Sequence, residues 1–161
     1  MAVKINSVPG AGTPLVGYNW EVVITRAPSG VSFPENLKLR AVSSTIPERR
    51  FDRIEINYQQ WVWVVPGREI ADKEITLEFW EGTDMAVRNA FVAWLKAVGD
   101  WESGRQGTKE DVSGDIQLKL LDESGNVIKI ITLRNAWPCE LKDINSVRFE
   151  VTFWFDWFEE S

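Results

Sequence analysis

Apolar and polar side chains alternate along several stretches of this chain, and strict alternation is the pattern of half-buried β-strands. The longest such stretch is VRFEVTFWFDW at residues 147–157. Because successive side chains of a strand point to opposite faces, one face of this stretch is apolar and holds Val147, Phe149, Val151, Phe153, Phe155 and Trp157. Similar patterns predict strands over residues 18–25, 37–44, 73–80, 115–121 and 127–133, and two strand segments within 51–65 that meet near Gln59 and Gln60.

One segment has the periodicity of an amphipathic helix instead. Its apolar side comprises Met85, Val87, Ala90, Phe91, Trp94, Leu95 and Val98. Thr83 is a good N-cap, and Gly99 suits the position after the helix. The glycine, proline and polar residues of three segments predict irregular structure: an extended N-terminal arm at residues 1–17 and loops at residues 101–114 and 135–146. We therefore expect a mainly β domain over residues 18–161, a two-sheet β-barrel or sandwich of about eight strands with one flanking α-helix.

The composition argues against several kinds of chemistry. The 161 residues include no histidine and one cysteine, Cys139, so the chain has neither a Ser-His or Cys-His nucleophile nor an internal disulfide. We expect no enzyme activity, no catalytic residue, no cofactor and no bound metal. The formal net charge of −6 argues against a surface that grips nucleic acid tightly. No apolar run approaches about eighteen residues, so we expect no membrane span.

The nine tryptophans invite two interpretations. We predict four core aromatic residues on otherwise apolar faces: Trp20, Phe91, Trp94 and Trp157. By contrast, Trp63, Trp80 and Trp154 interrupt patterns that burial within one protomer does not explain, so they are candidates for an interface. In an alternative interpretation, exposed tryptophans stack against sugar rings in a carbohydrate-binding module, which predicts that several of them share one flat exposed face.

Five segments, taken in order, carry a family resemblance: YNWEVVIT at 18–25, LKLRAVSSTIP at 37–47, PGREIADKEITLEF at 66–79, RNAFVAWLK at 88–96 and LRNAWP at 133–138. Their order and spacing resemble the tail tube proteins of contractile-tailed bacteriophages over nearly the whole chain. The last segment, which lies before the aromatic-rich final strand, is the most specific part. The tryptophan-rich strand at 60–65 departs from the family pattern.

The resemblance implies a structural protein without enzyme activity. Six protomers would form a ring in which four strands from each line a continuous inner barrel, and stacked rings would form the inner tube of a contractile tail. The implied partners are further copies of this chain, the tail sheath, baseplate and terminator proteins, the tape measure protein during assembly, and genomic DNA that passes without tight binding. The implied location is the tail of the virion, assembled in the host cytoplasm.

Two sets of residues are candidates for these roles. A negatively charged lumen would repel DNA phosphates, and the candidate lumen-facing residues are Glu21, Glu78, Glu150 and Asp156. The segment 44–65 combines basic residues with a strand too apolar to stay solvated, and the candidate inter-subunit residues are Pro47, Arg49, Arg50, Arg53, Trp61, Trp63, Trp80 and Trp154.

Two alternatives share the same fold. The chain is also consistent with a baseplate-proximal protein that initiates the tube, and with the inner tube subunit of a phage-derived contractile injection particle. Both need the same ring contacts, so the sequence does not separate them. The carbohydrate-binding module stays as an alternative from a different class.

Overall fold

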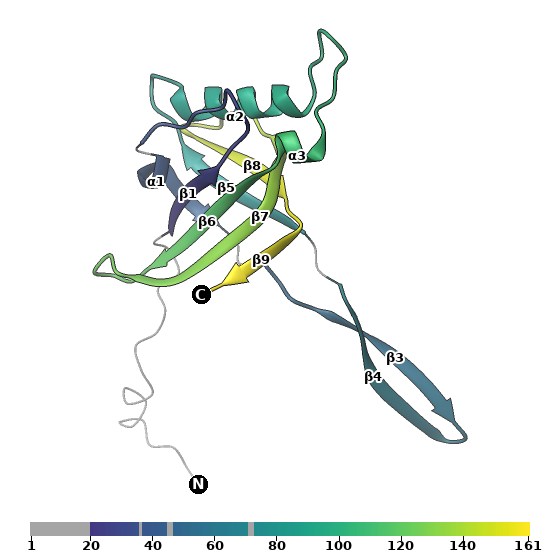
Figure 1. Cartoon of the computed structure of the whole chain (residues 1–161). Coiled ribbons are helices and arrows are strands. Elements are labelled where there is room, and N and C mark those ends of the chain that lie inside the picture. Colours follow the sequence, from purple (N-terminus) through teal and green to yellow (C-terminus); the bar gives the residue numbers. More distant parts are fainter. Residues whose placement is uncertain (1–19, 36, 45–46, 71–72) are drawn as a thin grey trace, which may run out of the picture.

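The computed structural model describes residues 20–35, 37–44, 47–70 and 73–161 (Figure 1). The predicted N-terminal arm, residues 1–17, lies outside the described residues. Most described strands form one curved antiparallel sheet with the order β1, β6, β7, β8, β5, β2. These strands span Trp20–Arg26 (β1), Gly114–Leu121 (β6), Val127–Leu141 (β7), Arg148–Trp154 (β8), Glu74–Trp80 (β5) and Ala41–Ser44 (β2). The edge strands β1 and β2 contact each other, so the sheet is a nearly closed barrel.

Strand β7 bends at Asn135 and links the two walls of the barrel. Its first half pairs with β6, and its second half pairs with β8. Asn135 has a φ of 53°, a left-handed conformation that asparagine tolerates better than most residues. The loop predicted for residues 135–146 is therefore wrong up to Leu141, because Asn-Ala-Trp-Pro interrupts the alternation without ending the strand. Register shifts on both sides of this motif mark the irregularity.

The predicted final strand, residues 147–157, is two strands in the structure. Strand β8 ends at Trp154, and β9 (Trp157–Glu160) pairs with the first half of β7. At the bend, the backbone N–H of Asp156 donates to the carbonyl oxygen of Arg134 at 3.0 Å. The bend changes which face each side chain occupies. Trp157, expected in the core, is consequently 51% exposed, and Phe158 is buried in its place.

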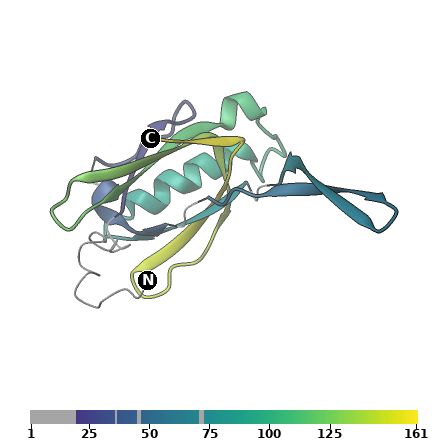
Figure 2. The same ribbon diagram turned by 90° about the horizontal axis from the view of Figure 1, so that it is seen from below.

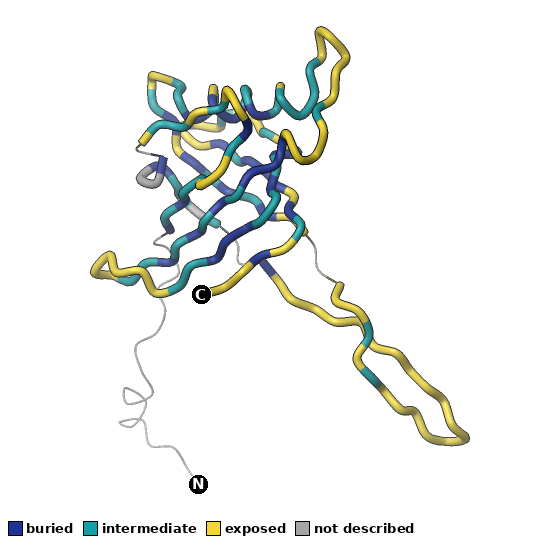
Figure 3. The backbone as a smooth tube through the Cα atoms, viewed as in Figure 1, coloured by how far each residue is buried: buried dark blue, intermediate teal, exposed yellow. Residues whose placement is uncertain are grey.

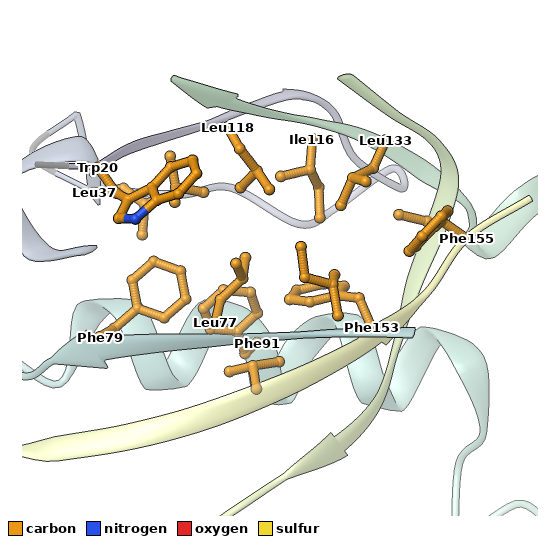
Figure 4. Close-up of a cluster of buried hydrophobic side chains, with 14 of the residues drawn as sticks. Trp20, Leu37, Leu77, Phe79, Phe91, Ile116, Leu118, Leu133, Phe153 and Phe155 are labelled. Atoms are coloured by element: carbon orange, nitrogen blue, oxygen red, sulfur yellow. The ribbon is translucent and has the colours of Figure 1, made fainter. Parts of the chain in front are cut away.

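The core lies between the two walls (Figure 4). Trp20, Ile116 and Leu118 come from one wall and face Leu77 and Phe153 from the other. Helix α2 (Ala86–Val98) runs across one end of the strands and buries Phe91 and Trp94 completely (Figures 1 and 2). The indole N–H of Trp94 donates to the carbonyl oxygen of Val112 at 2.7 Å. The helix therefore packs on the sheet, as its broad apolar stripe predicts.

Both ends of α2 differ from the prediction. The N-cap is Met85, not Thr83, and no side-chain hydrogen bond caps the helix from that position. Glu81 instead accepts a hydrogen bond from the backbone N–H of Arg88 at 2.7 Å, and Asp84 accepts one from Ala86 at 3.3 Å. These carboxylates satisfy donors of the first turn. Gly99 is extended, with a φ of −156°, so the end of the helix does not require a glycine.

Two short helices occupy segments where none was predicted. Helix α1 (Leu37–Arg40) replaces the first half of the strand expected over 37–44, and α3 (Lys109–Val112) lies within the loop expected over 101–114. Arg40 at the end of α1 is buried and pairs with buried Glu81 at 3.0 Å. This ion pair ties α1 to the turn that precedes α2. A tertiary contact therefore overrides the local strand pattern.

Candidate functional site

A long β-hairpin projects away from the barrel (Figures 1 and 2). It consists of β3 (Phe51–Tyr58) and β4 (Trp61–Glu69), joined by Gln59 and Gln60 as the sequence predicts. Gln59 has a φ of 53°, which a two-residue hairpin turn of the favoured type requires. Near the root, Gly67 approaches the backbone of Asp52 so closely that a Cβ atom would lie 3.1 Å from its carbonyl oxygen.

One face of this hairpin consists of aromatic and aliphatic side chains. The register pairs Tyr58 with Trp61, Ile56 with Trp63, and Ile54 with Val65, and directly paired residues share a face. Every residue of β3 is exposed, and Trp61 and Trp63 are 76% and 64% exposed (Figure 3). We call these six residues the hairpin face. A contiguous apolar surface on an element with no core beneath it is typical of a protein–protein contact.

The opposite face of the hairpin is mixed in character. It carries Val62 and Val64 together with Arg53 and Glu55, whose side chains form an exposed ion pair at 3.1 Å. The two faces thus offer an internal comparison, because they share one backbone and differ only in the side chains they present.

The other predicted inter-subunit residues lie outside the hairpin face. Pro47 is buried, and the guanidinium of Arg49 lies 4.8 Å from the centre of the Phe158 ring. Arg50 is exposed, and its carbonyl oxygen accepts a hydrogen bond from Ile70 at the hairpin root. Trp80 and Trp154 are 40% and 47% exposed on the outer face of the β5–β8 wall. The structure therefore places this set in two areas, the hairpin with its root and the β5–β8 wall.

The structure does not bring the four lumen candidates together. Glu78 and Glu150 are direct cross-strand partners on the outer face of the β5–β8 wall. Glu21 lies on β1, in the wall on the other side of the core. Asp156 lies in the bend between β8 and β9, where its carboxylate bonds to Lys109 and Asn135. One wall that lines a channel can present the Glu78–Glu150 pair or Glu21, but not both.

A polar network holds the bend of β7. Asn135 donates through its backbone N–H to Asp115 at 3.3 Å and through its amide to Asp156 at 3.0 Å, and its side-chain oxygen accepts from Arg26 at 3.0 Å. Arg134 bridges Asp115 and Glu159 at 3.3 and 3.2 Å. The LRNAWP segment is therefore distinctive for a structural reason, since its asparagine forms a corner of the barrel.

The same network lowers the pKa values of three carboxyl groups. Burial alone would raise the pKa of Asp115, but hydrogen bonds from Arg26 and the backbone of Asn135 hold it below its ordinary value. The hydrogen bond from Lys109 lowers the pKa of Asp156, and the one from Arg134 lowers the pKa of Glu159. All three groups are charged near neutral pH and stabilise the bend in that form.

Sequence reasoning missed several exposed aromatic and apolar residues. Ile54, Ile56 and Tyr58 complete the hairpin face. A two-residue turn at Gln59 and Gln60 sets the pairing of the two strands, and this pairing puts these three residues on the same face as Trp61 and Trp63. Trp101 is 98% exposed within the segment expected to be a loop. Trp137 packs edge-on against Trp154, with ring centres 5.3 Å apart, in a segment expected to be a loop.

The described part of the chain contains neither a membrane-spanning helix nor a metal-binding cluster. Within residues 20–35, 37–44, 47–70 and 73–161, no helix is long and apolar enough to cross a membrane. Nor do His, Cys, Asp and Glu side chains of these same residues gather into a group of three or more that could hold a metal ion.

Comparison with known proteins gives matches only at the level of structure. No family model matches the chain, and no curated protein matches it. A chain of the anti-feeding prophage tube-terminating cap is 20% identical, covers 93% of this chain and 92% of its own, and superposes with a TM-score of 0.63. A chain of an extracellular contractile injection system sheath–tube complex is 16% identical, with 99% of both chains covered and a TM-score of 0.63.

A third similar chain comes from the six-fold symmetrised baseplate of the anti-feeding prophage, with 12% identity, 93% of this chain and 97% of that chain covered, and a TM-score of 0.66. The TM-scores of 0.63 to 0.66 over most of each chain show a shared fold. This chain has the fold of tube components of contractile injection systems, which agrees with the tail tube resemblance of its sequence. The mainly β barrel with a flanking helix is confirmed.

Proposed function

We propose that this protein is a structural subunit of the tube of a contractile particle, in which six copies form a ring and rings stack into a conduit. The observation that carries the proposal is the hairpin face, which leaves Trp61 and Trp63 largely exposed in the protomer. An isolated two-stranded hairpin is marginal in water, so this element gains stability from a neighbouring copy. The shared fold with tube components supports the same role.

The location and remaining partners follow from this role. A tube subunit contacts the sheath around it and the baseplate and terminator at its ends, and the tape measure protein occupies its lumen during assembly. In a phage tail, assembled in the host cytoplasm, DNA would then pass through it. The structural neighbours from an injection system and a prophage particle favour a phage-derived contractile particle as strongly as a phage tail. A baseplate-proximal tube protein remains the alternative position.

We assign the lumen to the β5–β8 wall, because its outer face is acidic. Beyond the Trp154 end of the wall, the register and side-chain alternation give this face three glutamates against two basic residues: Glu78, Glu140 and Glu150 against Lys142 and Arg148. The basic side chains lie near the glutamates, at 3.2 Å for Lys142 and Glu150 and 3.9 Å for Arg148 and Glu78. Repetition of this excess around a ring would keep DNA phosphates from adhering.

The carbohydrate-binding alternative has one supporting feature, since Trp61 and Trp63 share an exposed face. However, their neighbours on that face are Ile54, Ile56 and Val65, which cannot hydrogen-bond sugar hydroxyls. The side-chain polar groups of the hairpin face are the hydroxyl of Tyr58 and the indole N–H groups of Trp61 and Trp63. This composition matches the apolar centre of a protein interface better than a sugar-binding platform.

The experiment replaces Trp61 and Trp63 with serine and measures assembly by sedimentation and microscopy. We expect a folded protomer with an unchanged melting temperature that forms no rings or tubes. The matched control, Val62→Thr with Val64→Thr, changes the opposite face of the same strand and should assemble. Tubes of normal length from the Trp61→Ser, Trp63→Ser variant would refute the role of the hairpin face.

A further inference from the structure

A groove with an aromatic floor lies near the root of the hairpin. A cavity of about 500 Å³ is lined by Trp137, Trp154 and Phe155 from the end of the β7–β8 wall and by Val98 and Val112 from α2 and α3. A second cavity of about 310 Å³ shares Lys73, Phe155 and Asp156 with the first, and it reaches Arg49 and Glu69 at the hairpin root. Because they share these lining residues, the two cavities are together called the Trp137 groove below.

The groove combines an apolar floor with a polar rim. Trp154 is 47% exposed although its ring packs against Trp137, so an indole face remains available. The lining contains three basic and three acidic residues, Arg49, Lys73 and Lys109 against Glu69, Glu74 and Asp156, and Lys109 pairs with Asp156. The groove therefore has no net charge that an uncharged occupant would leave unmatched. This arrangement is typical of the centre of an interface, where an aromatic pocket lies inside a polar ring.

The hairpin of the same chain cannot reach this groove. Its root lies at one end of the groove, and its strands run outward from the barrel (Figure 1). Strand β4 has nine residues, and at about 3.3 Å per residue its tip lies on the order of 30 Å from the root. Only the hairpin of another copy can bring Tyr58 and Trp61 to the groove.

We propose that the Trp137 groove receives the tip of the hairpin face from a second copy of this chain. The inference rests on the proposed tube function and specifies its contact. The tip fits because residues 57–61, Asn-Tyr-Gln-Gln-Trp, carry no charge and place Tyr58 and Trp61 side by side on one face. Edge-on or offset contacts between these rings and the groove tryptophans would add to the apolar burial.

This contact joins two different surfaces, so it is heterologous. A heterologous contact repeats from copy to copy and produces a closed ring or an open stack instead of stopping at a dimer. One protomer carries both surfaces, since the network at the β7 bend includes Asp156 of the groove lining and the hairpin root borders the same groove. One protomer thus contains both halves of the contact, as a self-assembling subunit requires.

The test uses cross-linking between two singly labelled proteins. Gln60→Cys marks the hairpin tip and Gln106→Cys marks the groove rim, each in a Cys139→Ser background, and neither change removes an aromatic side chain. The two proteins are mixed before assembly and treated with a short bis-maleimide. We expect covalent dimers that contain one copy of each variant, and none from either variant alone. A Ser124→Cys protein, labelled at the exposed β6–β7 turn, replaces the groove variant as a control and should not cross-link.

The outcomes separate this inference from the tube function. If parent and variants form tubes but the mixture gives no more dimer than the Ser124→Cys control, the groove assignment is wrong and the tube function stands. If Gln60→Cys alone cross-links as strongly as the mixture, the hairpins pair with each other and the heterologous contact is wrong. If the parent forms no assembly under any condition, the tube function itself fails.

Discussion

Replacement of Trp94 tests whether α2 is an integral part of the barrel core. Trp94 is fully buried, its ring lies 5.7 Å from that of Phe153, and its indole N–H bonds to the carbonyl oxygen of Val112. We expect Trp94→Ala to lower the free energy of unfolding by about 3–5 kcal/mol, the usual cost of removing a buried aromatic side chain. This is a large part of the roughly 5–15 kcal/mol that stabilises an ordinary domain.

Trp94→Phe divides this loss into two parts. Phenylalanine retains much of the apolar contact but leaves the buried carbonyl of Val112 without its donor, which costs about 1–3 kcal/mol. The assay is equilibrium urea unfolding of the unassembled protomer, followed by circular dichroism, at two protein concentrations to exclude a contribution from association.

Trp101→Ala is the matched control for both variants. It also removes one tryptophan, but from a side chain that is 98% exposed, so its effect should stay within about 0.5 kcal/mol. A Trp94→Ala protein whose midpoint and slope equal those of Trp101→Ala would refute the packing of α2 described above.

Three further predictions concern the polar contacts. Asn135→Ala should cost about 2–4 kcal/mol through a strained left-handed backbone and lost hydrogen bonds, and Asn135→Gly should recover about 1 kcal/mol in the same urea assay. Glu81→Ala leaves Arg40 buried beside one half-exposed partner, Asp84, and should cost about 3 kcal/mol, whereas Asp84→Ala should cost much less because its carboxylate stays hydrated. The pKa of Asp115 is lowered on folding, so its carboxylate increases the free energy of unfolding at pH values above its ordinary pKa of about 4. This increase is lost as pH falls through the lowered pKa. Asp115→Asn should therefore flatten the acid side of a plot of unfolding free energy against pH.

The sequence predicts the strands of this fold better than their bends. Alternation placed Phe149, Val151 and Phe153 correctly because these residues face one core along a regular strand. It failed for Trp157, because the bend at Asp156 depends on hydrogen bonds to Arg134 and Asn135, which are distant in the sequence. A pattern of period two has no means of detecting a change of face that a tertiary contact imposes.

The candidate site shows the same limit. Trp61 and Trp63 are predicted as contact residues because an apolar strand next to basic residues stands out in the sequence. The Trp137 groove could not be predicted, since its walls come from β7, β8, α2 and α3 and meet only after folding. Glu21 and Glu78 look equivalent in the sequence, and only the sheet order places them in different walls.

Electron microscopy of the purified protein, at concentrations that favour association, tests the central claim most directly. The proposed function predicts six-fold rings, or tubes of stacked rings with a continuous central channel, and image averages should place the β5–β8 wall around that channel. A protein that remains monomeric at every concentration, or that assembles without a central channel, would contradict the claim that this chain is a tube subunit.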